Sequence, residues 1–354
     1  MKLDVIQKRN FAAAIRIMLA GLAIAFVYPA FRHGFKESVH FINAFFIGLF
    51  GGAFVSYCEL VLFQNLKKPR AFIPRVLFKT AIYFIGFALF IPAIILVCES
   101  IYYQRGLKEH FDSPLFQDFI FKKDFGIILI YALFFLLVVI FTREISSKLG
   151  QGVLWNYITG KYHRPRTEKR LFMFIDIRNS TRIAEKLGDL EFHSFVHTFI
   201  QDLTPVILAY RGLIFRYVGD QIGITWNEMQ GFHQANCLRL FLSAQNTILR
   251  NREKYLEAYG IVPKFVACLH FGPIVVGELG DVKSQIVYVG EAIHVLGQME
   301  RQFKHSKEGT FLIISDEVAG KMSIPGLYDL QNLGQLDLEV GSFNISTLIE
   351  KKMD

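Results

Sequence analysis

Two aspartates carry the clearest chemical signal in this sequence. Asp176 ends the apolar segment 171–177, and Asp220 lies in the short link between the segments 213–218 and 221–226. The first segment predicts a buried strand that ends in a carboxylate, and the Gly-Asp link between the other two predicts a hairpin. In a sheet where these strands are neighbours, both carboxylates can reach one point at its edge.

Oxygen ligands that converge on one point indicate a hard divalent cation. Two carboxylates, with the backbone carbonyl of Ile177, suit Mg²⁺ or Mn²⁺, which also bind phosphate oxygens. Two such ions activate an attacking hydroxyl group and stabilise a leaving pyrophosphate. The residues that follow predict a helix N-terminus, whose unpaired N–H groups bind phosphate; they are Arg178, Asn179, Ser180 and Thr181.

The elements that must position these groups alternate between strand and helix patterns. Helix patterns cover the residues 179–211, 231–258 and 290–306. The apolar segments 264–272 and 273–280 predict a second hairpin, and a further strand is expected at 311–315. The order strand, helix, hairpin, helix, strand predicts an α+β sandwich of the ferredoxin-like kind.

The beginning of the chain has a different character. The 354 residues are 52% hydrophobic, whereas soluble domains average about 45–50%. Four stretches are long and apolar enough to cross a bilayer: Phe11–Phe31, Val39–Cys58, Thr80–Cys98 and Phe125–Thr142. We therefore expect a four-helix transmembrane region over 1–142, a juxtamembrane linker over 143–170 and a second domain over 171–354.

The positive charges follow these apolar stretches. The net charge is +8, but the basic residues flank the spans and form no stripe typical of nucleic-acid binding. Their concentration before the first span, between the second and third, and after the fourth predicts both termini on the cytoplasmic side of the plasma (inner) membrane. Glu59, near a span end, is expected to extend toward the lipid–water interface. The four cysteines lack CxxC spacing, so no disulfide framework or zinc ribbon is predicted.

Four short blocks stand out in the second half of the chain. They are FIDIRNST (174–181), FRYVGD (215–220), HFGPIVVGELG (270–280) and VYVGEAIHVLGQME (287–300). In this order they resemble the catalytic domain of class III adenylate and guanylate cyclases, and the architecture resembles bacterial membrane-bound members. The resemblance implies a ferredoxin-like nucleotide cyclase domain that converts ATP to cyclic AMP and pyrophosphate, with two Mg²⁺ or Mn²⁺ ions at the interface of a homodimer.

The resemblance also assigns roles to individual positions. Asp176, Asp220 and the carbonyl of Ile177 match the metal ligands, and the turn that follows Ile177 matches the phosphate-binding turn. Arg216 stands where the family has a base-reading Lys, and Val287 stands at the second base-reading position. Guanylate cyclases usually carry an acid at the first of these positions, so the resemblance favours ATP.

The other half of the implied site comes from the partner chain and departs from the family pattern. His294 replaces an Asn that orients the ribose, and Gln298 replaces an Arg that meets the charge of the transition state. The residues 334–345 contain no Lys or Arg where a phosphate-binding Lys is expected. Two functions therefore stay open: a homodimeric adenylate cyclase, or an impaired cyclase-fold signalling module that binds nucleotide or pairs with another cyclase.

Overall fold

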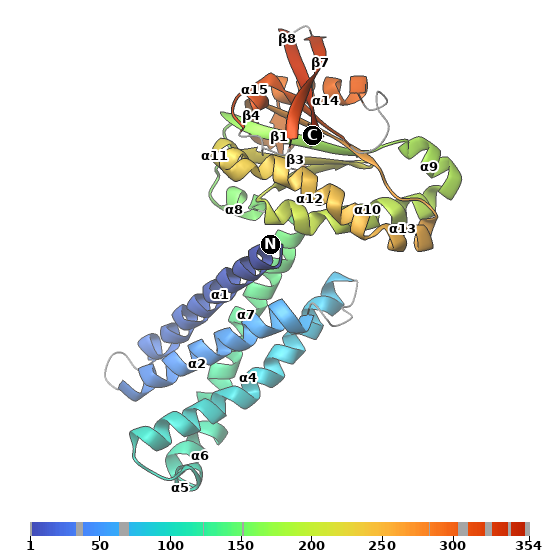
Figure 1. The fold of residues 1–354 in the computed structure, drawn as a ribbon. Helices are drawn as coiled ribbons and strands as arrows, with labels where there is room; N and C mark the ends of the chain where they lie inside the picture. The colour runs from blue at the N-terminus through green and yellow to red at the C-terminus, as the bar shows by residue number, and fades with distance from the viewer. Residues whose placement is uncertain are drawn as a thin grey trace. The chain divides into compact units, whose positions relative to one another are not determined.

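The computed structural model of the chain divides into two compact units, Met1–Lys148 and Leu149–Asp354 (Figure 1). The residues that the structure describes are 2–32, 38–63, 71–122, 124–150, 152–282, 284–303, 311–322, 328–338 and 341–350.

Four long apolar helices dominate the first unit and confirm the four predicted spans. Within the described residues, the stretches suited to crossing a membrane are Ala14–Arg32, Ser38–Leu62, Phe72–Tyr102 and Asp124–Ser146. They belong to α1 (Lys2–Arg32), α2 (Ser38–Tyr57) with the π-helical turn η1 (Cys58–Leu62), α4 (Phe72–Tyr102) and α7 (Asp124–Leu149). Two short helices, α5 (Leu107–Phe111) and α6 (Pro114–Phe121), connect α4 to α7.

Glycines allow α1 and α2 to pack closely. A Cβ atom added at Gly48 of α2 would lie 2.7 Å from the Cα of Leu22, and one added at Gly52 would lie 2.7 Å from the Cα of Met18. Their four-residue spacing places both glycines on one face of the helix. Small residues at this spacing let the backbones of two membrane helices approach each other.

A buried cluster of charges joins η1, α4 and α7. The Nζ of Lys79 lies 3.2 Å from Oε1 of Glu59 and 3.0 Å from Oε1 of Glu144. The hydroxyl of Tyr83 donates a hydrogen bond of 3.0 Å to Glu59. Charges in apolar surroundings are costly unless they are paired. Glu59 therefore turns inward to partners on neighbouring helices, which differs from the expected extension toward the interface.

The second unit contains an eight-stranded mixed sheet in the described part of the chain. The strand order is β2-β3-β1-β4-β6-β8-β7, with β5 paired to β4. The strands are β1 (Arg166–Ile177), β2 (Leu213–Val218), β3 (Gln221–Asn227), β4 (Phe265–Leu279), β5 (Gln285–Val289), β6 (Phe311–Ser315), β7 (Tyr328–Leu338) and β8 (Gly341–Glu350). The helices are α8 (Val153–Ile158), α9 (Ser180–Leu187), α10 (Asp189–Ala209), α11 (Glu228–Phe232), η2 (His233–Ala235), α12 (Asn236–Arg250), α13 (Arg252–Tyr259), α14 (Glu291–Phe303) and α15 (Asp316–Ala319).

Four adjacent strands at one side of this sheet confirm the predicted ferredoxin-like arrangement. The strands β2, β3, β1 and β4 are adjacent in that order, and each pair is antiparallel. Alternate residues of β1 face opposite sides, so Met173 and Ile175 pack with α10 and α12 in one core. Phe172 and Phe174 pack with α14 in the other core. Figure 1 shows α10 and α12 side by side along one face.

Three predicted elements differ from the structure. The helix predicted over 179–211 breaks into α9 and α10 at Gly188, where φ is +76°. The helix predicted over 231–258 is interrupted because Gln234 and Ala235 both adopt left-handed backbone conformations. The hairpin predicted around Pro273 is wrong, since β4 runs through it as one strand.

The position of Pro273 explains why a single strand tolerates it. The outer edge of β4 pairs with β6 through residues 266–269 and with β5 through residues 275–279. Pro273 lies between these two paired stretches. Its missing N–H group therefore interrupts no pairing recorded on that edge.

The close contact between α1 and α2 predicts the effect of adding one methyl group. Gly48→Ala places a Cβ against backbone atoms, which no rotamer change can relieve, so we expect a loss of about 1–3 kcal/mol. The measurement is the apparent melting temperature of the full chain in detergent. Gly126→Ala in α7 is the matched control, since a Cβ there meets nothing within 4 Å. Equal melting temperatures for the two variants contradict the packing.

Candidate functional site

The candidate site lies where β1 and the β2–β3 hairpin end together. In the antiparallel pairing of β1 with β3, Ile175 is opposite Ile222. Asp176 is the next residue along β1, and Asp220 lies two residues before Ile222, in the turn of the hairpin. The register therefore brings both aspartates to the same end of the strand pair.

Both carboxylates are withdrawn from solvent. Asp176 is 2% exposed, and Asp220 is partly buried. The Oδ1 atom of Asp176 and the Oδ2 atom of Asp220 are inaccessible to water. Because burying a negative charge is costly, a cation bound between the two carboxylates would offset part of the cost.

The backbone that leaves β1 is firmly held. The side chain of Ile177 is buried in the core beneath α10, so only its carbonyl is a candidate ligand. The N–H group of Arg178 donates to the carbonyl of Lys264 at 2.8 Å. The guanidinium of Arg178 stacks on the ring of Phe311, 5.1 Å from its centroid. This side chain is therefore occupied by packing, and the turn contributes through its backbone.

The residues after Arg178 form the expected helix N-terminus. Asn179 adopts a left-handed conformation with φ of 55°, and α9 begins at Ser180. The first N–H groups of a helix, here including those of Ser180 and Thr181, have no partner within the helix. Such groups bind anionic phosphate oxygens.

The oxygen donors at this edge fit magnesium or manganese. In the part of the chain that the structure describes, no group of three or more His, Cys, Asp or Glu side chains could hold a metal ion. The available donors are two carboxylates and one backbone carbonyl. Mg²⁺ commonly binds one or two carboxylates together with waters and substrate phosphates. The donor set therefore fits an ion whose coordination is completed by a nucleotide.

We call the end of the strand pair that carries Asp176 and Asp220 the aspartate edge. Arg216 is held on the face of the sheet next to this edge. Its guanidinium lies 4.6 Å from the ring centroid of Phe174 and 5.5 Å from that of Phe215. Its Nη2 donates to Oε1 of Gln221 at 3.4 Å. Burial lowers the pKa of Arg216, and the charge of Glu300 opposes that shift. Arginine stays charged in proteins, so Arg216 supplies a fixed cation here.

Gln221 and Glu300 are residues of this region that the sequence analysis missed. The Nε2 of Gln221 donates a short hydrogen bond to Oε2 of Glu300. Burial, together with the negative charges of Glu300 and Asp176, raises the pKa of the Cys268 thiol well above its usual value. Gln221 follows an aspartate already singled out, but no sequence pattern connects it to Glu300, which lies 79 residues away on α14.

The residues expected to serve a partner chain lie on the outer side of α14. His294 is exposed and Gln298 is partly exposed, one helical turn apart. The opposite side of the helix is buried and contains Ala292, Val295, Leu296, Met299 and Phe303. Within the described residues, no side-chain hydrogen bond or ion pair is found between His294 or Gln298 and the aspartate edge.

The structure does not bring the side chain of Val287 together with that of Arg216. It pairs with Gly277 across the β4–β5 ladder. Its neighbour Tyr288 packs against Phe215, with ring centroids 4.9 Å apart. Because successive side chains of a strand face opposite sides, Val287 lies on the face of β5 away from this aromatic contact.

Comparison with solved structures identifies the fold. A bacterial light-regulated adenylyl cyclase matches with a TM-score of 0.53 at 18% identity, covering 66% of this chain and 68% of that chain. The C-terminal domain has the class III nucleotide cyclase fold. At this level of identity the match describes the cyclase fold alone.

Two curated proteins are similar to this chain in sequence. Adenylate cyclase 2 of Rhizobium meliloti (strain 1021) is 30% identical over 212 residues, which cover 60% of this chain and 58% of that protein. Adenylate cyclase of Anabaena cylindrica is 22% identical over 167 residues, which cover 47% of this chain and 33% of that protein. This chain therefore spans less than two thirds of each relative. No family model matches it.

Proposed function

We propose that the chain is a membrane-bound adenylate cyclase that converts ATP to cyclic AMP and pyrophosphate at a homodimer interface. The observation that carries the proposal is the β1–β3 register, which places Asp176 and Asp220 at one edge beside the start of α9. Similarity to two proteins named adenylate cyclase supports the choice of reaction.

The aspartate edge serves the triphosphate. Asp176, Asp220 and the carbonyl of Ile177 would hold two Mg²⁺ or Mn²⁺ ions. When bound, such ions activate a hydroxyl group and stabilise the charge of a leaving group. The N–H groups that open α9 bind phosphate oxygens. The 3′-hydroxyl of the ribose attacks the α-phosphorus and gives its proton to solvent water. A P–O bond forms to the 3′-oxygen, and the P–O bond between the α-phosphorus and the departing pyrophosphate breaks.

The other candidate residues serve the base and the ribose. Arg216 donates a hydrogen bond to a ring acceptor of adenine. Val287, whose side chain lies on the other face of β5, is given no contact with the base. His294 and Gln298 of one chain reach the nucleotide held by the aspartates of the other. Both side chains can donate hydrogen bonds, and the amide of Gln298 carries no charge.

The predicted orientation of the membrane domain supports a reaction on the cytoplasmic side. The basic residues around the spans favour both termini in the cytoplasm. The C-terminal domain then meets cytoplasmic ATP, and the membrane spans bring two copies together.

Mixing two inactive variants tests whether one site is built from two chains. Asp176→Ala removes a metal ligand and should lower the production of cyclic AMP by at least about 100-fold, the scale of losing one strong electrostatic contact. The double variant His294→Ala, Gln298→Ala damages only the partner half. We expect co-expression of the two full chains to restore cyclic AMP that neither produces alone.

The assay uses Mn²⁺ with ATP, and the tagged chains are purified together to confirm that they associate. Unchanged activity in Asp176→Ala contradicts the metal site. Association without recovery contradicts the sharing of residues between chains.

A second candidate function is a cyclase-fold signalling module with impaired turnover. The observation that favours it is the neutral Gln298 on the outer side of α14, together with the absence of Lys and Arg from 334–345. An arginine that meets transition-state charge contributes about 10³–10⁵ in rate in other phosphoryl-transfer enzymes. Such a module would bind nucleotide and act with a complete homologue.

Restoring the positive charge distinguishes the two functions. We expect His294→Asn, Gln298→Arg to raise the turnover of ATP by at least about tenfold, a small part of what such an arginine contributes elsewhere. The matched control is Gln302→Arg, which adds the same charge to an exposed position one turn further along α14. If the unaltered chain is inactive and the double variant gains activity, the protein is the impaired module. If the unaltered chain is already active, the protein is a cyclase. Equal effects of the two arginines contradict the role given to Gln298.

A further inference from the structure

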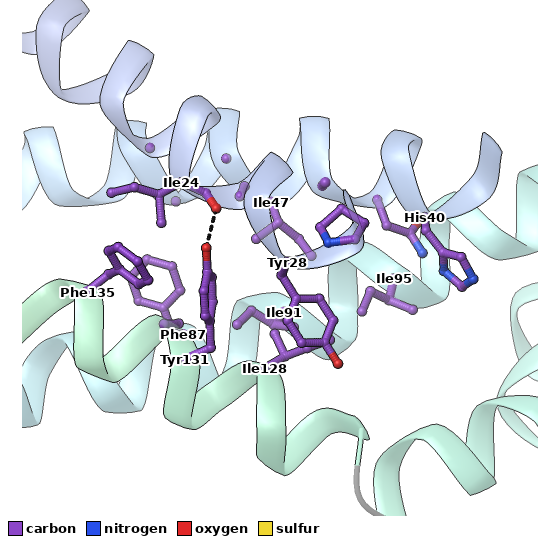
Figure 2. Close-up of a pocket in the computed structure, with 18 of the residues that line it drawn as sticks. Ile24, Tyr28, His40, Ile47, Phe87, Ile91, Ile95, Ile128, Tyr131 and Phe135 are labelled. Carbon is purple, nitrogen blue, oxygen red and sulfur yellow. Dashed lines mark hydrogen bonds between the residues drawn. The ribbon is translucent and has the colours of Figure 1, made fainter. Parts of the chain in front are cut away.

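The first unit contains a partly open cavity among its membrane-spanning helices. Its volume is about 900 Å³, and its lining comes from α1, α2, α4, α6 and α7. Figure 2 shows side chains of these spans around it. This volume lies within the range of small-molecule binding sites, about 300–1,000 Å³.

Most of the cavity wall is apolar. Figure 2 shows Ile24, Ile47, Ile91 and Ile128 contributed by four different helices. Ile91 is 1% exposed, which places it well inside the unit. A wall of branched aliphatic side chains favours an apolar chain and offers no partner to a polar one.

One end of the cavity carries buried hydrogen-bonding groups. Asn43, which lines the cavity, is 5% exposed. Its Nδ2 donates to Oε1 of Glu99 at 2.9 Å. The carbonyl oxygen Oδ1 of the same amide is buried and makes no hydrogen bond within the described residues. A buried acceptor without a partner costs about 1–3 kcal/mol, so this atom favours a ligand that donates.

The charge at this end favours the same kind of group. Oε2 of Glu99 lies 3.2 Å from Nε2 of His110, which is its only ion-pair partner in the part of the chain that the structure describes. Lys122, a cation that also lines the cavity, already pairs with Asp118. A carboxylate head group would therefore face Glu99 and an acceptor oxygen, whereas an amine or hydroxyl would complement both.

We propose that this cavity binds a single-chain amphiphile whose head group is an amine or a hydroxyl. The head group donates a hydrogen bond to Oδ1 of Asn43 beside Glu99. The apolar chain extends along the aliphatic wall formed by the spans. The site is separate from the aspartate edge of the cyclase-fold domain, and its test does not depend on nucleotide turnover.

Three probes with the same chain test the head-group preference. Native mass spectrometry of the detergent-purified full chain is used to count bound dodecylamine, 1-dodecanol and dodecanoate. We expect one amine or alcohol per chain, and at least about tenfold weaker binding of the carboxylate, since it leaves two acceptors facing each other. Equal binding of all three probes overturns the proposal, because it indicates unspecific partition.

Variants locate the bound probe. Ile91→Trp fills the cavity and should abolish binding, while Ile85→Trp, on an exposed face of the same helix, should leave binding unchanged. Asn43→Leu keeps the size of the side chain and removes the acceptor, so the preference for amine over carboxylate should fall about tenfold. Unchanged binding in Ile91→Trp, or a phospholipid that occupies the site and resists displacement by the probes, contradicts the proposal. The head-group comparison on the unaltered chain holds even if a variant fails to fold.

Discussion

The candidate active site depends on one register, the antiparallel pairing of β1 with β3. A shift of one residue would turn Asp176 to the other face of the sheet, because side chains alternate along a strand. The pairing is held by core residues on both faces, with Met173 and Ile175 on one side and Phe172 and Phe174 on the other. Packing of ordinary apolar side chains therefore fixes where two carboxylates meet.

The same packing separates the two halves of the site within one chain. The aspartates lie at an edge of the sheet, whereas α14 buries its apolar side against that sheet and turns His294 and Gln298 outward. Groups on an outer helix face are available to a second copy of the chain. This arrangement is the physical reason for proposing a dimer.

Patterns within short segments of the sequence predicted the elements and the aspartate edge well. Apolar length was enough to find the four spans, and the strand before Asp176 with the Gly-Asp link before β3 was enough to place a hairpin. Breaks within long elements were not visible, since Gly188 looks compatible with a helix that continues. Pro273 looked like a turn, and only the pairing of β4 with β1, β5 and β6 shows why the strand continues.

Contacts between residues that are far apart along the chain could not be predicted from the sequence. The hydrogen bond from Gln221 to Glu300 joins residues 79 positions apart, and that from Asn43 to Glu99 joins residues 56 positions apart. Glu59 lies near a span end, a position typical of interfacial residues, but the fold brings Lys79 beside it. In each case tertiary packing buries a polar side chain. Its partner depends on the tertiary structure, which no local sequence pattern reveals.

The most direct measurement of the central claim is the electron paramagnetic resonance spectrum of Mn²⁺ bound to the full chain with a non-hydrolysable ATP analogue. If Asp176 and Asp220 share two ions, the spectrum shows a spin-coupled pair of Mn²⁺ ions that is lost in Asp220→Asn. A single uncoupled ion, or a coupled signal that persists in Asp220→Asn, would contradict the account.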